Sequence, residues 1–220
     1  ATGWSPDGDV LYTTPHYSTL PQNQLVKINL ETGARERVPL YTASEGAYDS
    51  TGRTLYFVRP AFHNNVTKQY KGGTARDVWK FVDGAPEAVE LTGDYDGESH
   101  SPMWWDGRVY FVTDRDGAMN IWSMDENGGG LRQHTRHEGW DVQHPDLQSG
   151  RITYQVGADL WMYDIASGRN ALIPVSLASD LDQLRERWVD PMENLTSAHL
   201  DAEGERVVVT ARGRVFVAPV

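Results

Sequence analysis

Short apolar strands separated by glycine-containing turns recur five times along the chain. Each unit has a tight turn, an apolar strand, a second strand that usually carries a tryptophan, another turn and a short third strand. The first turns of the units contain Gly8, Gly52, Gly107, Gly150 and Gly204, which lie between about 43 and 55 residues apart. A repeat of this length built from short strands is typical of β-propeller blades. The pattern predicts an all-β chain, a β-propeller segment of four near-complete blades plus the first strands of a further blade.

The tryptophan of the second strand has a fixed place in the repeat. Residues 77–81, 120–124 and 159–163 share the order polar, apolar, tryptophan, variable, apolar. Because Trp79, Trp122 and Trp161 recur at one repeat position, we interpret them as packing between neighbouring blades.

The repeat also predicts the domain organisation. Residues 1–175 form a partial propeller, 176–195 a linker, and 196–220 the first strands of a second propeller. The predicted blades span about residues 1–40, 41–92, 93–135 and 136–175. Within the linker, Ser179 to Asp182 could cap a short helix through Arg187, or the stretch could be extended. Propellers typically close with four to eight blades, and unpaired β edges associate readily, so we expect self-association through open blade edges or an irregular closure.

Composition and charge exclude several classes of protein. The 220 residues are 39% hydrophobic, and no apolar run approaches the roughly 18 residues that would suggest a membrane-spanning helix. The formal net charge of −11 argues against nucleic acid as a partner. The absence of cysteine excludes disulfides and thiolate metal sites. We therefore expect neither a membrane nor a nucleic-acid partner.

Three histidines close in sequence raise the possibility of a metal site. His134, His137 and His144 lie near Glu138 and Asp141. Their spacing matches no established zinc pattern, so we favour histidines that hydrogen-bond to backbone or carboxylate groups on an inter-blade connection. Neither a metal nor any other cofactor is predicted.

Other motifs favour structure over chemistry. Residues 114–117 (DRDG) resemble the start of a calcium loop but lack the third oxygen ligand and the distal glutamate, so they predict a hairpin turn. The chain contains no Gly-x-Ser-x-Gly nucleophile elbow, phosphate loop or dinucleotide fingerprint. An enzyme acting on its own is therefore not expected from this chain.

Several segments resemble the tricorn-type proteases, whose repeat is shared with TolB-like proteins. They are residues 70–79 (YKGGTARDVW), 102–111 (PMWWDGRVYF), 114–123 (DRDGAMNIWS) and 131–135 (LRQHT). The stretch 182–200 resembles the junction between the first and second propellers of that family. The resemblance covers essentially the whole chain.

The resemblance implies a role within a larger protein. Tricorn-like proteases are cytosolic serine peptidases with a six-bladed propeller, a seven-bladed propeller, a PDZ domain and a catalytic domain. By this resemblance, residues 1–175 correspond to the last four blades of the six-bladed propeller, and 196–220 open the seven-bladed one. No catalytic residue of the family transfers to this chain. The implied function is a noncatalytic, cytoplasmic channel or filter for short peptides, with the remaining domains of a parent serine peptidase as partners.

Two other functions remain open from the sequence. One is a TolB-like propeller module that binds a protein partner. The other is a propeller lyase with a histidine-ligated metal.

The loop over residues 59–76 is the best candidate for direct contact with a ligand. It carries Arg59, Lys68, Lys71 and Arg76 without one acidic residue. Lys68, Lys71 and Arg76 flank a Gly–Gly pair whose backbone amides could form an anion nest. We hypothesise that these three cations meet a peptide carboxylate or an acidic domain. The alternative is a solvated hairpin tip.

Overall fold

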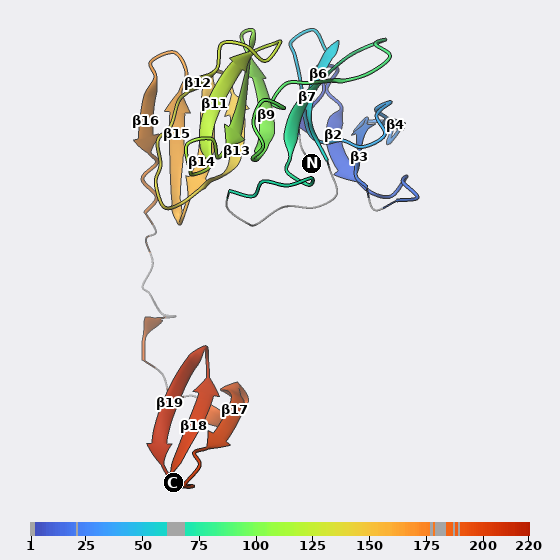
Figure 1. Ribbon diagram of the computed structural model, residues 1–220. Helices are drawn as coiled ribbons and strands as arrows, with labels where there is room; N and C mark the ends of the chain where they lie inside the picture. The colour runs from blue at the N-terminus through green and yellow to red at the C-terminus, as the bar shows by residue number, and fades with distance from the viewer. Residues whose placement is uncertain are drawn as a thin grey trace. The chain divides into compact units, whose positions relative to one another are not determined.

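The computed structural model describes residues 3–20, 22–60, 69–176, 178, 184–186, 188 and 190–220. Five antiparallel sheets hold the strands, which pair in chain order within each sheet (Figure 1). The all-β prediction is therefore confirmed. The chain divides into two compact units, Ala1–Pro174 and Val175–Val220, which we describe separately. Within the described ranges, no helix is long and apolar enough to cross a membrane.

The first unit consists of four four-stranded sheets, which we call blades A to D. Blade A contains β1 (Gly3–Trp4), β2 (Val10–Thr14), β3 (Gln24–Ile28) and β4 (Arg35–Arg37). Blade B contains β5 (Ser44–Tyr48), β6 (Thr54–Arg59), β7 (Asp77–Val82) and β8 (Val89–Glu90). Blade C contains β9 (Ser99–Trp105), β10 (Arg108–Thr113), β11 (Asn120–Asp125) and β12 (Arg132–Gln133). Blade D contains β13 (Val142–Gln148), β14 (Arg151–Val156), β15 (Asp159–Asp164) and β16 (Arg169–Leu172).

Each blade begins with a strand that precedes the glycine turn of its repeat unit. The strands β5, β9 and β13 lie before the turns that contain Gly52, Gly107 and Gly150. β5 contacts both β1 and β9, and β9 contacts β13, so the first strands of the four blades are neighbours. These strands escape a search for apolar segments because they are rich in polar residues and contain proline or glycine. They also line the cavity described below.

Three apolar clusters hold neighbouring blades together. Trp79 packs against the cluster that joins blades A and B, which includes Leu25 and Phe57. Trp122 packs against the cluster of blades B and C, and Trp161 against that of blades C and D. The prediction that the repeated tryptophan packs between blades is confirmed. Burial of large aromatic side chains at each junction stabilises the stack of blades.

One glycine allows the first strand of blade B to approach this packing closely. A Cβ atom added at Gly46 would lie 2.7 Å from Leu11 Cδ2 and 2.9 Å from Leu25 Cδ1. Both leucines are fully buried, so they cannot readily give way. Gly46 therefore fixes the position of β5 against blade A.

The second unit is a three-stranded sheet preceded by a short 3₁₀ turn. Asp190 caps the turn η2 (Pro191–Asn194), because its Oδ1 accepts a hydrogen bond from the Met192 N–H at 2.9 Å. The strands are β17 (Leu195–Leu200), β18 (Arg206–Ala211) and β19 (Arg214–Pro219). The helix considered for residues 179–187 lies mostly outside the described residues.

Candidate functional site

A cavity of about 880 Å³ lies along the first strands of the four blades. Its lining comes from β1, β5, β9 and β13, together with residues of the loop after β6 and of the β10–β11 hairpin. Each strand contributes because the blades share one orientation, which places their first strands next to one another. The cavity is therefore a product of the repeat, and each blade supplies one strand to its wall.

A β-bulge in each of three strands places a polar residue at this wall. The pairing register of β5, β9 and β13 shifts by one residue near Glu45, Ser101 and His144. These residues have φ angles of 51°, 52° and 50°, which are uncommon for residues other than glycine. All three line the cavity. Bulges redirect side chains locally, so the same backbone device gives blades B, C and D one polar group each at the wall.

Arg76 is the central cation of the wall. Its Nε and Nη2 donate to Glu98 Oε2 at 3.1 and 2.8 Å, and its Nη1 donates to Glu45 Oε1 at 3.1 Å. Both Arg76 and Glu98 are buried. Buried ion pairs depend on complete hydrogen bonding to offset desolvation, and a guanidinium can satisfy two carboxylates at once. Arg76 thus joins blade B to the start of blade C.

Glu45 also bonds to the first strand of the next blade. The Ser101 N–H donates to Glu45 Oε2 at 2.7 Å, and the Ser101 hydroxyl lies 3.2 Å from the same oxygen. Burial opposes ionisation of Glu45, but the charge of Arg76 and the two contacts from Ser101 lower the pKa of its carboxyl below the usual range. His100 is held neutral near pH 7, because burial and Arg76 lower its pKa to about 4.

Asp114 supplies a further carboxylate beside this pair. Its Oδ1 accepts hydrogen bonds from the Glu98 N–H and the Tyr95 hydroxyl, both at 3.1 Å. Its Oδ2 is buried and has no hydrogen-bond partner among the described residues, as is also true of Glu98 Oε1. Burial and Asp114 raise the pKa of Tyr95 to about 12, so Tyr95 remains a neutral donor.

The cationic loop falls partly within the described residues. Lys68 lies outside them. Arg59 stacks on Trp79, with 4.8 Å between its Cζ and the ring centroid, and its Nε donates to the Thr42 carbonyl at 3.2 Å. Lys71 Nζ lies 5.7 Å from the Tyr95 ring centroid. Arg76 already has two internal carboxylate partners, so its charge is neutralised within the unit.

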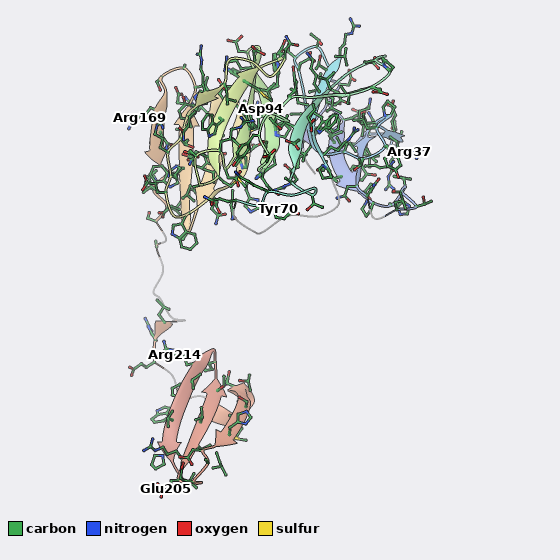
Figure 2. All side chains as sticks on the ribbon, viewed as in Figure 1. Arg37, Tyr70, Asp94, Arg169, Glu205 and Arg214 are labelled. Atoms are coloured by element: carbon green, nitrogen blue, oxygen red, sulfur yellow. The ribbon has the colours of Figure 1, made fainter. Side chains whose placement is uncertain are left out.

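The loop is held against the β10–β11 hairpin. Gln69 Nε2 donates to the Gly117 carbonyl at 2.9 Å, and the Gly72 carbonyl accepts from the Ala75 N–H at 2.9 Å, which closes a turn. Tyr70 next to Gln69 is labelled in Figure 2, as is Asp94. Asp94 receives two hydrogen bonds of 2.8 Å from Arg115, whose guanidinium also stacks on Tyr95. The DRDG segment is thus the turn of the β10–β11 hairpin, as its sequence predicts.

Two of the three neighbouring histidines bridge blades C and D through hydroxyl groups. Ser123 Oγ accepts from Arg108 Nη2 at 3.0 Å and lies 2.7 Å from His134 Nε2, and His134 Nδ1 lies 2.8 Å from the Tyr163 hydroxyl. Burial and Arg108 lower the pKa of His134 to about 4. His137 Nε2 lies 2.9 Å from the Tyr154 hydroxyl. The prediction of backbone or carboxylate partners is therefore wrong for the side chains of His134 and His137, which contact hydroxyl groups instead.

His144 has a different environment from the other two histidines. It is exposed and lies on the bulge of β13 at the cavity wall. In the described part of the chain, no group of three or more His, Asp or Glu side chains is arranged to hold a metal ion.

Sequence reasoning missed the residues that form the wall. Glu45, His100 and Glu98, the buried partner of Arg76, stand in no motif, and Asp114 opens the DRDG segment, which predicts only a hairpin turn. One signal is present in hindsight: the x-Pro pairs Ser101–Pro102 and His144–Pro145 occupy the same place in successive repeats. Proline inside strands is largely confined to edges and bulges, so this recurrence indicates bulged inner strands.

Comparison with known proteins places this architecture in a family. A family model described as the tricorn protease N-terminal beta propeller domain matches residues 1–169. The tricorn protease homolog of Saccharolobus solfataricus is 26% identical over 216 residues, which cover 98% of this chain and 20% of the relative. The chain therefore spans about a fifth of the length of that curated relative.

Solved structures agree with the fold. A crystal structure of the tricorn protease matches with a TM-score of 0.74 and 23% identity, over 99% of this chain and 21% of that chain. TolB from Acinetobacter baumannii matches with a TM-score of 0.59 and 16% identity, over 99% of this chain and 53% of that chain. Because the family model spans most of the sequence, the chain belongs to the tricorn protease N-terminal β-propeller domain family.

Proposed function

We propose that blades A to D form a noncatalytic channel or filter for short peptides within a tricorn-like serine protease. The cavity of about 880 Å³ along the first strands is the observation that carries this proposal. A peptide presents amides and charged ends, and the bulged polar residues of the wall offer partners for such groups. The hydrolytic chemistry is assigned to other parts of the parent protein, which we place in the cytoplasm.

The cationic loop supplies the proposed contact with a carboxylate. Arg76 is neutralised by Glu45 and Glu98, so we assign it to anchoring the loop. Lys71 forms no ion pair with a carboxylate within the part of the chain that the structure describes, and its ammonium lies 5.7 Å from the centroid of the Tyr95 ring. Lys68 and Lys71 are therefore the residues that we assign to a peptide carboxylate or to an acidic face of the parent protein.

Charge reversal in the parent protease tests this assignment. The double variant K68E/K71E is expected to lower kcat/KM about tenfold for peptides with a free carboxyl end. Each substitution replaces an attraction to the peptide carboxylate with a repulsion. Amidated versions of the same peptides should be affected much less. The matched control is R169E/R206E, which changes the net charge equally at two exposed positions. Unchanged kinetics for both peptide forms would refute the assignment.

The remaining partners are also proposals. We infer that the 176–195 segment links the partial propeller to the start of a second one, and that open blade surfaces bind remaining parts of the parent or a second copy. Support comes from Leu160 and Leu172 on blade D, which are 46% and 49% exposed. Sedimentation of the 220-residue chain at rising concentration should show self-association. A monomer at every concentration would contradict it.

A further inference from the structure

The charges at the cavity wall and directly behind it do not balance. Glu45, Glu98 and Asp114 contribute three carboxylates, whereas Arg76 contributes one guanidinium. These groups form one connected set, since Arg76 bonds to both glutamates and the Glu98 N–H donates to Asp114. Buried charges are normally paired, because desolvation of an unpaired ion is costly. The set therefore lacks positive charge.

Two carboxylate oxygens mark where that charge is missing. Glu98 is 1% exposed and Asp114 is 3% exposed, yet Glu98 Oε1 and Asp114 Oδ2 have no hydrogen-bond partner among the described residues. Asp114 lines the cavity together with Arg76, Glu45 and Gln69, whereas Glu98 is not among the lining residues, so of the two carboxylates it is Asp114 that faces a ligand in the cavity. His100 does not supply the charge near neutral pH, because its imidazole is uncharged there.

The rest of the wall has the same sign of charge. Asp141 and Asp146 also line the cavity, and Arg76 is the one lysine or arginine among its described lining residues. A wall of this composition attracts cations and repels carboxylates. The described residues hold no group of three metal-ligating side chains, which favours an organic cation over a metal ion.

We infer that the wall around Asp114 and Glu45 binds the amino-terminal ammonium group of a peptide. This inference rests on the proposed peptide channel and assigns an orientation to the peptide bound in it. An ammonium carries three donors, which suit carboxylate oxygens that lack partners. With Lys68 and Lys71 meeting the carboxyl end, the two charged regions would orient a peptide by its two ends.

Two matched peptides test the ammonium site on the 220-residue chain. Both are the same short Ala/Gly peptide with an amidated carboxyl end, and one is also N-acetylated. Calorimetric titration at pH 7 should give a dissociation constant about tenfold lower for the free amine, as a charge-assisted hydrogen bond predicts. This comparison uses the unmodified protein, so it does not depend on the folding of any variant.

Variants then locate the site. Asp114→Asn keeps the Oδ1 acceptor and removes the charge, and it should abolish the preference for the free amine. Asp159→Asn removes one charge from an exposed position outside the cavity and should leave the preference intact. A loss of preference in both variants would indicate a general effect of net charge and would overturn the site.

Other outcomes separate this inference from the proposed function. Equal binding of the free and acetylated peptides would refute the ammonium site and leave the peptide channel standing. No binding of either peptide, nor of a version with a free carboxyl end, would refute both. Binding of calcium alone, lost in Asp114→Asn and without any preference between the peptides, would replace the ammonium site with a metal site.

Discussion

The Ser101 N–H donates to Glu45 Oε2 at 2.7 Å, which ties the first strand of blade C to that of blade B. Both residues sit on β-bulges with positive φ. A bulged residue leaves the regular ladder, so its N–H needs another acceptor. The carboxylate of one bulge satisfies the backbone of the next, and its other oxygen holds Arg76.

Removal of the Glu45 carboxylate should weaken this junction. Glu45→Ala leaves the Ser101 N–H without its acceptor and deprives Arg76 of one partner, so we expect a loss of about 2 kcal/mol in the free energy of unfolding. Glu45→Gln retains an acceptor and should cost about half as much. Urea unfolding measures both. Equal stability of Glu45→Ala and the wild type would contradict the role of this contact.

Gly46 next to that bulge should not tolerate a methyl group. Gly46→Ala places a Cβ within 3 Å of two buried leucine side chains, so we expect a loss of about 1–3 kcal/mol through overpacking. Gly73→Ala is the matched control, because its Cβ would meet nothing within 4 Å. Thermal unfolding compares the two. The prediction fails if both substitutions shift the midpoint equally.

Asp77 should destabilise the fold at neutral pH. Burial raises the pKa of its carboxyl to about 6, so the folded state prefers the protonated form. The protonated Asp77 carboxyl therefore stabilises the fold. This contribution to the free energy of unfolding is complete below the ordinary pKa near 4 and is lost as pH rises through 6. Asp77→Asn removes this loss and should raise the free energy of unfolding by about 1 kcal/mol at pH 7, after allowance for the partial exposure of Asp77.

The next blade provides the reciprocal test. In blade B, Asp77 Oδ1 accepts a hydrogen bond from the Thr92 hydroxyl at 2.8 Å. In blade C, Asn120 Oδ1 accepts the corresponding hydrogen bond from the Thr135 hydroxyl at 2.9 Å. An asparagine therefore already fits the equivalent position of blade C. Asn120→Asp should destabilise the unit at pH 7, and a stabilising effect would contradict the argument.

Acid should weaken the junction between blades C and D. His134 has a pKa of about 4 in the fold, below the ordinary 6.5, so it contributes stability above pH 6.5 that is lost as pH falls towards 4. His134→Gln should reduce the acid-induced loss in the free energy of unfolding between pH 7 and 4 by about 1–2 kcal/mol. The exposed His16→Gln serves as control. Unfolding curves between pH 7 and 4, recorded in an Asp77→Asn background, isolate the effect, and identical pH profiles would refute it.

The stability that the inter-blade tryptophans contribute should depend on the volume of their rings more than on their N–H groups. Trp79 Nε1 and Trp122 Nε1 are buried and lack hydrogen-bond partners among the described residues. Trp122→Phe therefore removes an unsatisfied donor and should cost less than about 1 kcal/mol. Trp122→Ala leaves a cavity and should cost about 3 kcal/mol. Chemical denaturation measures both, and equal losses would contradict this distinction.

The repeat, the turn glycines and the inter-blade tryptophans can all be predicted from the amino-acid sequence. These features depend on local turn geometry and on strands with apolar faces, so each is visible in a short window of residues. Trp79, Trp122 and Trp161 could be assigned to packing because they recur at one position. The DRDG hairpin was predictable for the same local reason.

The wall of the cavity, in contrast, depends on how the blades pack together. Glu45 and Ser101 are separated by 56 positions, and Arg76 and Glu98 by 22, so no local pattern links them. The first strands carry polar residues and proline, which hides them from a search for apolar alternation. Their bulges and their mutual contacts exist only when the blades stack. Arg76 illustrates the difference: its charge was visible in the sequence, but its two carboxylate partners come from strands and loops that folding brings together.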